Sequence, residues 1–252
     1  LIRIYLIWDI LPLPMHMSRI FHGKETWAKQ IEEVAGERPV VFMNKYQYPS
    51  VYWFYTGKKA FTRNNLLYRR NQYDVWPLES ELEGQNVLLT RWGAPDSSKV
   101  LSTVFGDIHY YDIERYCSFN RLKIEIPEEK PESMAGESFE VAVRISNPTS
   151  LEVSLDCDCD LPPLLMYAYI NEDRKTRFYT VEPQPVFGSI GLGSLEPGGE
   201  FLLDVRLIAP AEPGRYALTI SFGSRILLPG INGAPVELKI SPASQEKSLA
   251  QK

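Results

Sequence analysis

The chain has few of the residues that usually carry metal-dependent or redox chemistry, with only three cysteines and three histidines among 252 residues. Cys117, Cys157 and Cys159 match no four-ligand zinc spacing and form no disulfide framework. Cys157 and Cys159 would share one face of an extended strand, where we expect two buried structural thiols. The sequence therefore predicts no metal site.

Catalytic motifs are also missing. No histidine stands in a Glu-x-x-His or His-x-x-x-His relation, and no Gly-x-Ser-x-Gly turn is present. The glycine-rich stretch GSIGLGSLEPGG precedes an expected strand, whereas a phosphate-binding loop opens a helix. Paired carboxylates such as Glu32 and Glu33 lie in polar surroundings that would not raise a pKa. We predict no catalytic residue and no cofactor.

An excess of positive charge and a long hydrophobic run are absent as well. The formal net charge of -5 argues against nucleic acid as a partner. The opening stretch LIRIYLIWDILPLPM contains Arg3 and Asp9 and is broken by prolines, well short of the roughly 20 residues that a spanning helix needs. We interpret residues 1–18 as an apolar lead. Because the chain does not begin with Met, we expect it to be part of a longer protein.

The pattern of residues 19–120 predicts a small three-layer α/β domain with a mostly parallel sheet. An amphipathic helix is expected over residues 23–36, and SVYWFYT is compatible with a helix or a strand, of which we favour the helix. A further helix is expected in LESELEGQ, ending at Gly84. Buried strands are expected at residues 39–42, 86–92, 99–105 and 109–113.

Residues 121–242 show almost no helical period. Apolar residues alternate in about seven short runs separated by Pro/Gly turns, which predicts an all-β, immunoglobulin-like sandwich. The runs are RLKIEI, the stretch from Phe139, LEVSL, and those containing Tyr167, Leu203, Tyr216 and Leu238. The composition changes near Pro127, and residues 243–252 form a polar tail that we expect to be frayed.

The most unusual segment runs over residues 44–76. It holds six basic residues against one acidic residue, together with ten aromatic residues. Aromatic faces and guanidinium groups suit a phosphorylated glycan, a lipid phosphate or an anionic membrane face. The alternative interpretation is that the aromatics form core and the cations a solvated rim. The candidate contact residues are Lys58, Arg63, Arg69, Arg70 and Tyr73.

The motifs WDILPLP, FHGKETWAKQI, VVFMNKYQYPSVYWFYTGKKAF and RRNQYDVWP occur in this order over residues 1–92. Together they resemble the C-terminal extracytoplasmic region of bacterial family-39 glycosyltransferases. These integral-membrane enzymes are related to protein mannosyltransferases and to the aminoarabinose transferase of lipid A. The sandwich lies outside the resemblance.

The resemblance implies a parent enzyme that transfers a sugar from a polyprenyl-phosphate donor to a glycan or protein acceptor. The transfer would occur at the periplasmic face of the bacterial cytoplasmic membrane. It also implies that the catalytic acidic residues lie between membrane helices outside this chain, so that this region is an accessory to the membrane-embedded part. Two other hypotheses stay open from the residues alone: a stand-alone extracytoplasmic carbohydrate-binding module, and a nucleotide-using enzyme that lacks the usual glycine loop.

Overall fold

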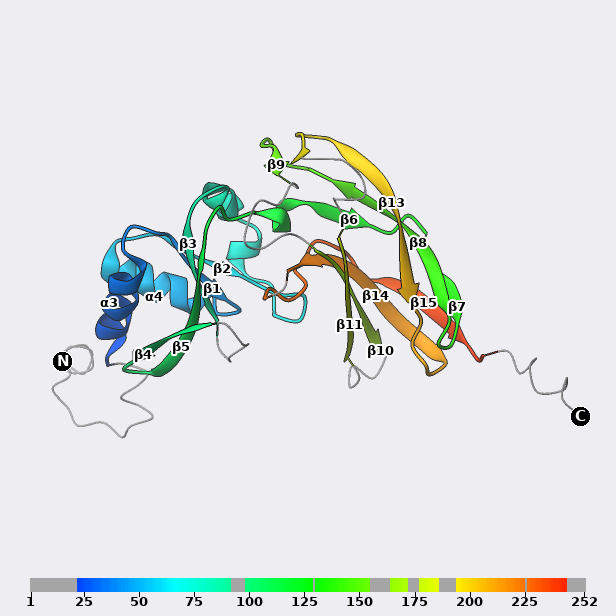
Figure 1. Ribbon diagram of the computed structural model, residues 1–252, viewed down its shortest axis with the longest axis horizontal. Helices are drawn as coiled ribbons and strands as arrows, with labels where there is room; N and C mark the ends of the chain where they lie inside the picture. The colour runs from blue at the N-terminus through cyan, green and yellow to red at the C-terminus, as the bar shows by residue number, and fades with distance from the viewer. Residues whose placement is uncertain are drawn as a thin grey trace, which may run out of the picture. The chain divides into compact units, whose positions relative to one another are not determined.

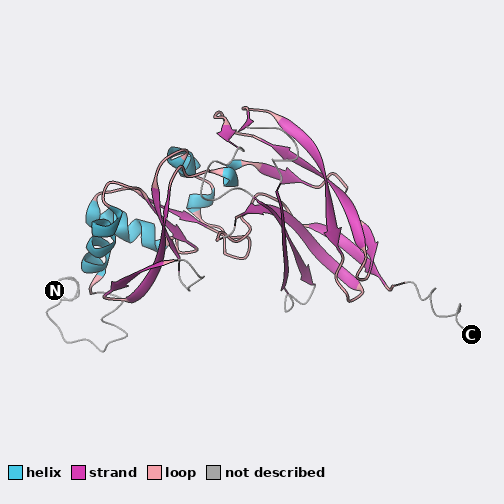
Figure 2. Ribbon diagram, viewed as in Figure 1, coloured by secondary structure: helices cyan, strands magenta, loops and turns pink. Residues whose placement is uncertain are grey.

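The computed structural model describes residues 22–91, 98–128, 130–154, 164–171, 177–185, 194–224 and 226–243. The predicted lead over residues 1–18, the cysteines Cys157 and Cys159, and nearly all of the predicted tail fall outside these ranges. Within them the chain is mostly β, with strands gathered into several sheets (Figure 2).

The chain divides into two compact units, Leu1–Tyr116 and Cys117–Lys252 (Figure 1). The sequence placed the boundary four residues later, between residues 120 and 121. The 3-10 helix η3 (Phe119–Arg121) belongs to the second unit. One reason is that the Asn232 side-chain amide donates a hydrogen bond of 2.8 Å to the Phe119 carbonyl.

The first unit contains a five-stranded sheet in the order β2-β1-β3-β5-β4. Strands β2, β1 and β3 are parallel, whereas β5 is antiparallel to both β3 and β4. The prediction of a mostly parallel sheet is therefore corrected to a mixed sheet. Strands β4 and β5 are joined by a tight turn, which only an antiparallel pair permits. The strands are β1 (Val40–Met43), β2 (Ala60–Arg63), β3 (Val87–Arg91), β4 (Lys99–Thr103) and β5 (Gly106–Ile113).

Two helices cover one face of this sheet. They are α3 (Lys24–Ala35) and α4 (Gln47–Thr56), and both confirm helices predicted from the sequence. Trp27 of α3 stacks on Phe42 of β1 with ring centroids 5.7 Å apart, and Tyr52 of α4 is fully buried in the same core. Burial raises the pKa of Tyr52 to about 12. The core is therefore built from aromatic rings contributed by both helices and by β1.

Two elements of this unit differ from the expectations. Strand β2 was not predicted, because a four-residue strand between cationic residues carries little pattern, although all four of its residues are buried. The helix expected in LESELEGQ is the 3-10 helix η2 (Pro77–Leu82), preceded by a shorter one, η1 (Gln72–Asp74). The Asn71 side chain caps η1 by accepting from the Tyr73 amide at 3.0 Å.

In the second unit, the described residues form a five-stranded sheet ordered β11-β10-β14-β15-β7, a three-stranded sheet ordered β13-β8-β6, and the small pair β12-β9. All seven predicted strand runs are confirmed, whereas β7, β11 and β12 were not predicted. The strands are β6 (Lys123–Glu125), β7 (Glu132–Met134), β8 (Ser138–Ser146), β9 (Val153–Ser154), β10 (Leu164–Asn171), β11 (Arg177–Pro185), β12 (Ser194–Leu195), β13 (Glu200–Ile208), β14 (Gly214–Gly223) and β15 (Val236–Ser241).

The three-stranded sheet buries alternate side chains, whereas β10 and β14 of the five-stranded sheet bury consecutive residues. Two such sheets are compatible with a β-sandwich. On β8 the buried positions are Val141, Val143 and Ile145, with exposed or half-buried residues between them. The Tyr169 hydroxyl on β10 donates to the Ile208 carbonyl on β13 at 2.7 Å and so joins one sheet to the other. Burial raises the pKa of Tyr169 far above its ordinary value, which keeps this donor protonated.

Candidate functional site

Helix α4 carries large apolar residues on both of its sides. Tyr52 is buried on the side that faces the core. On the opposite side, Trp53 and Phe54 are 38% and 80% exposed. Tyr46, Ser50, Trp53 and Phe54 follow one another at helical spacings of three and four residues and thus share this outer face. A helix that is apolar all round is normally buried, so an exposed outer face points to a contact beyond the unit.

The outer face of α4 continues into the segment around η1. The hydroxyls of Ser50 and Tyr73 are hydrogen-bonded at 3.2 Å, and the Tyr73 ring lies 5.8 Å from the ring of Trp76. Trp76 is 50% exposed and its neighbour Val75 is 81% exposed. We call Trp53, Phe54, Val75 and Trp76 the apolar patch.

Cations border the apolar patch at the start of α4. Arg69 donates from Nη2 to the Tyr46 hydroxyl at 2.6 Å, and its guanidinium lies 5.0 Å from the centre of the Tyr46 ring. Arg70 is exposed beside it. Lys45 Nζ lies 6.0 Å from the centre of the Tyr48 ring. We call Lys45, Arg69 and Arg70 the cationic rim.

No carboxylate in the part of the chain that the structure describes forms an ion pair with Arg69 or Arg70. Nearby acids have other partners. Asp74 accepts from the Asn64 side chain and from the Asn71 amide, each at 2.7 Å. Farther along, Glu81 pairs with Lys59 at 3.0 Å. The two arginines are therefore left with positive charge available to an external anion.

The loop that carries the two arginines is anchored by asparagines. Asn44, which ends β1 with a positive φ of 56°, accepts a hydrogen bond from the Asn65 amide at 2.8 Å. Asn65 in turn accepts from the amides of Leu67 and Tyr68. Asparagine tolerates the left-handed conformation and bonds to nearby backbone in this way. The loop is thus held by local hydrogen bonds at both ends.

Lys58, a predicted contact residue, does not belong to the cationic rim. Its ammonium group donates to the Gly36 carbonyl at 2.9 Å and pairs with Glu37 at 3.1 Å and Glu32 at 3.4 Å. The hydrogen bond to Glu37 raises the pKa of Lys58 above its ordinary value. Its charge is already compensated at the C-terminal end of α3.

Arg63, another predicted contact residue, is buried in β2 with 3% of its surface exposed. It faces Tyr116, whose hydroxyl donates to Glu79 Oε1 at 2.8 Å. Burial and the Glu79 carboxylate raise the pKa of Tyr116 well above its ordinary value, so that the phenol stays a donor. A side chain this buried is unable to grip an external phosphate, which removes Arg63 from the predicted set.

Of the five predicted residues, the structure brings Arg69, Arg70 and Tyr73 together around the start of α4. Tyr73 is 9% exposed, so its side chain packs beneath the surface and offers little area to an external ligand. Sequence reasoning did not single out Trp53, Phe54, Val75 or Trp76 as surface residues. A signal was present, because residues 47–56 are apolar on every side of the expected helix.

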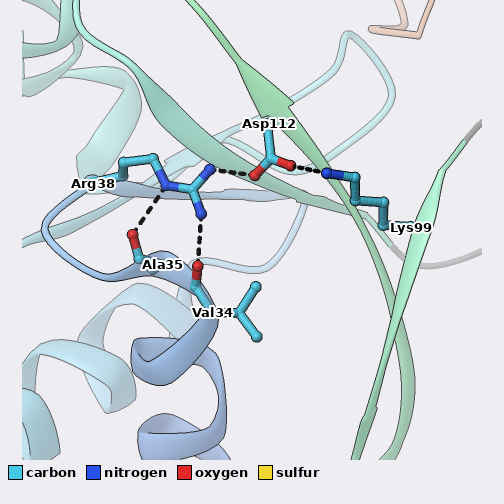
Figure 3. A network of polar contacts seen from close by, with 5 residues as sticks. All are labelled: Val34, Ala35, Arg38, Lys99 and Asp112. Carbon is cyan, nitrogen blue, oxygen red and sulfur yellow. Dashed lines mark hydrogen bonds and ion pairs between the residues drawn. The ribbon is translucent and has the colours of Figure 1, made fainter.

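A polar network closes the C-terminal end of α3 (Figure 3). Arg38 donates to the carbonyls of Val34 and Ala35 at 2.6 and 3.0 Å and also pairs with Asp112 on β5. Lys99 on β4 pairs with the other Asp112 oxygen at 2.5 Å. Partial burial opposes ionisation of Asp112, but the hydrogen bonds from Lys99 and Arg38 hold its pKa below the ordinary value. We assign this network a structural role.

Two hollows among the described residues of the second unit share Tyr216. One has a volume of ≈ 310 Å³ and the other of ≈ 370 Å³. The first is lined by Tyr169, Ile208, Ala209, Pro210, Ala211, Glu212 and Tyr216. The second is more polar and is lined by Ile170, Asn171, Arg215, Tyr216, Ala217, Pro235, Val236 and Glu237. Arg215 and Glu237 form an ion pair of 3.3 Å beside it.

The described ranges offer neither a metal site nor a membrane-spanning helix. They contain no group of three or more His, Cys, Asp or Glu residues placed to hold a metal ion. Their helices are also too short or too polar to cross a bilayer.

No protein-family model and no curated protein matches the chain. Among solved structures, Pseudomonas fluorescens alkylpurine DNA glycosylase AlkC is 10% identical over 48% of this chain and 30% of that chain, with a TM-score of 0.30. Listeria innocua β-glucosidase is 14% identical over 53% and 17%, with a TM-score of 0.29. The C-terminal domain of wzt is 10% identical over 66% and 86%, with a TM-score of 0.29. The chain thus spans less than a third of the first two structures, and likenesses at this level identify no function.

Proposed function

We propose that this chain is an accessory extracytoplasmic region of a membrane glycosyltransferase of the family-39 type, which uses a polyprenyl-phosphate-linked sugar donor. In this proposal the catalytic residues lie elsewhere in the parent enzyme. The chain contributes a surface that contacts the phosphate of the donor. The parent would act at the periplasmic face of the bacterial cytoplasmic membrane.

The observation that carries the proposal is the pair of exposed arginines beside the apolar patch. Arg69 and Arg70 have no carboxylate partner among the described residues, and Arg69 is held in place by its hydrogen bond to Tyr46. A guanidinium group suits a phosphate because it donates two parallel hydrogen bonds. The apolar patch next to it offers aromatic faces to a sugar ring or a prenyl chain.

A transfer assay on the full-length parent tests this proposal. In the double variant Arg69→Ala plus Arg70→Ala we expect KM for the donor to rise by about tenfold or more, because each charge-assisted hydrogen bond contributes roughly 1.5–3 kcal/mol. We expect kcat to change little, because the arginines do not touch the reacting bond. Arg206→Ala, at an exposed arginine of the second unit that lines neither hollow, is the matched control. An unchanged KM in the double variant would refute the phosphate contact.

A second candidate function rests on the two hollows around Tyr216. Tyrosine rings beside polar side chains are a common way to hold a saccharide, so the second unit is a candidate carbohydrate-binding module. Glycan-array screening of the chain, followed by calorimetry on Arg215→Ala and Glu237→Ala, would distinguish the two functions. Glycan binding that these substitutions abolish, with no effect from Arg69→Ala plus Arg70→Ala, would favour the module over the glycosyltransferase accessory.

We also propose a finer description of both folds. In the second unit, Tyr216 near the start of β14 donates to the Glu212 carbonyl at 2.9 Å, as in the tyrosine corner of immunoglobulin-like sandwiches. The parallel pairing of β15 with β7 adds a fifth strand to the β14 sheet. In the first unit, Val41, Val87 and Leu89 point away from the two α-helices yet are buried, as is Leu82 of η2, which supports a third layer formed by the segment that contains η2.

A further inference from the structure

We propose that the apolar patch and the cationic rim together bind the headgroup region of a bilayer that contains anionic phospholipid. The chain would bind there as a peripheral protein, through its own residues. This inference does not require that the parent be a glycosyltransferase, and it concerns the bilayer surface rather than the sugar donor.

Exposed apolar side chains are concentrated in the apolar patch. The described residues contain ten exposed large hydrophobic residues, and four of them form the apolar patch. These four include every exposed tryptophan and phenylalanine of the ten. Tryptophan and other aromatic residues are enriched at the level of lipid headgroups, and amphipathic surfaces of this kind lie in the plane of the interface.

The apolar patch is formed by two segments that are joined by a hydrogen bond. Trp53 and Phe54 are adjacent on the outer face of α4, whereas Val75 and Trp76 follow η1. The Ser50–Tyr73 hydrogen bond of 3.2 Å connects the two segments. The ring of the buried Tyr73 contacts the ring of Trp76. The four side chains are therefore presented by a fixed scaffold, with little ordering left to occur on contact with a surface.

The positive charge of the cationic rim is complementary to the negative charge of lipid phosphates. Arg69 and Arg70 border the patch, and Asp74, the acid nearest in sequence, is occupied by Asn64 and the Asn71 amide. Lipid phosphates would supply the missing anions, and each basic residue near an anionic bilayer surface strengthens binding by about fivefold. Apolar insertion and phosphate contact would thus act on the same side of the molecule.

The same charge argues against a second copy of the chain as the occupant. A symmetric dimer built on the apolar patch would bring the cationic rims of both copies to one interface. Neither rim arginine has a carboxylate of its own chain beside it in the described residues, so the two copies would repel one another. A bilayer has no such cost, because its phosphates carry the opposite charge.

The test is co-flotation of the chain with two kinds of vesicle, pure phosphatidylcholine and equal parts of phosphatidylcholine and phosphatidylglycerol. We expect binding to the mixed vesicles that weakens as salt is raised. Phe54→Ser plus Val75→Ser should weaken binding by about tenfold or more, because both side chains are largely exposed and leave the core intact. Arg69→Ala plus Arg70→Ala should remove most of the preference for phosphatidylglycerol. Leu202→Ser, at a residue of β13 that is 65% exposed, is the matched control.

A spectroscopic readout locates the contact. Brominated lipids should quench tryptophan fluorescence of the wild-type chain, and the quenching should fall in Trp53→Phe plus Trp76→Phe. The proposal is overturned if folded wild-type chain binds neither vesicle at low salt, or if the patch variants bind as wild type does. It is also overturned if the chain forms a dimer in solution that Phe54→Ser plus Val75→Ser dissociates, because a second copy then covers the patch.

Discussion

At the scale of single residues, Asp112 joins three elements through one carboxylate. Arg38 connects it to the last carbonyls of α3, and Lys99 connects it to β4 (Figure 3). Because its pKa is lower in the folded chain than its ordinary value, folding favours the ionised form. The contribution to stability is complete above the ordinary pKa of about 4 and is lost as pH falls through the folded pKa.

We therefore expect Asp112→Asn to lower the free energy of unfolding of the first unit by roughly 1 kcal/mol at neutral pH, since the pair is partly exposed. The difference from wild type should shrink as pH falls below the ordinary pKa of about 4. All five tryptophans lie before residue 93, so fluorescence during urea unfolding reports on this unit alone. Asp107→Asn, on the same strand, is the control, because Asp107 accepts only a hydrogen bond from Ser102. A difference that persists unchanged at pH 3 would contradict this account.

The burial and the partners of single side chains at the site could not be predicted from the sequence. The basic and aromatic character of residues 44–76 pointed to the segment that carries most of the apolar patch and the cationic rim. It could not separate Arg69, which is exposed, from Arg63, which faces Tyr116 and Glu79 inside the unit. The partners of Arg63 lie far along the chain, so its burial depends on pairing that no local pattern encodes. The same holds for Lys58, whose partners Glu32 and Glu37 belong to α3 and to the turn after it.

At the scale of elements, strands in which apolar and polar residues alternate could be predicted, whereas short strands without such a pattern could not. Strand β8 alternates buried and accessible residues from Val141 to Ser146, and its position was predicted. Strands β2 and β12 have four and two residues and are defined only by the neighbour with which they pair. The mixed order of the first sheet was likewise not predictable, because the direction of pairing depends on connections rather than on composition.

The segment after β14 shows how a connection can be as constrained as a strand. Asn232 donates to the carbonyls of Phe119 and Leu122, both at 2.8 Å, and Gly233 lies against the β14 backbone. A Cβ added at Gly233 would collide with the Ile220 carbonyl oxygen, and backbone has little freedom to move away. The glycine is thus required here by close approach and not by its φ.

We expect Gly233→Ala to lower the free energy of unfolding of the second unit by about 2–4 kcal/mol through this overlap. Gly198→Ala is the matched control, because its φ of 72° is strained for alanine but its surroundings are open. That variant should cost only about 1 kcal/mol. Differential scanning calorimetry of both variants gives the comparison. Equal costs would show that the contact with Ile220 relaxes freely.

At the scale of the whole molecule, the two units carry different surfaces. The first presents the apolar patch and the cationic rim, and the second presents two hollows around Tyr216. The chain as a whole is acidic, with a net charge of -5, so the rim is a local exception that the total charge conceals. We propose that a surface of this kind gives the first unit a preference for phosphate-bearing lipids.

Direct titration tests that claim. A short-chain polyprenyl phosphate is titrated into the chain by calorimetry, with the corresponding polyprenol and inorganic phosphate as comparison ligands. We predict that the polyprenyl phosphate binds more tightly than either comparison ligand, and that Arg69→Ala plus Arg70→Ala weakens its binding by about tenfold or more while Arg206→Ala does not. Equal binding of polyprenol and polyprenyl phosphate, or an unchanged Kd in the double variant, would contradict it.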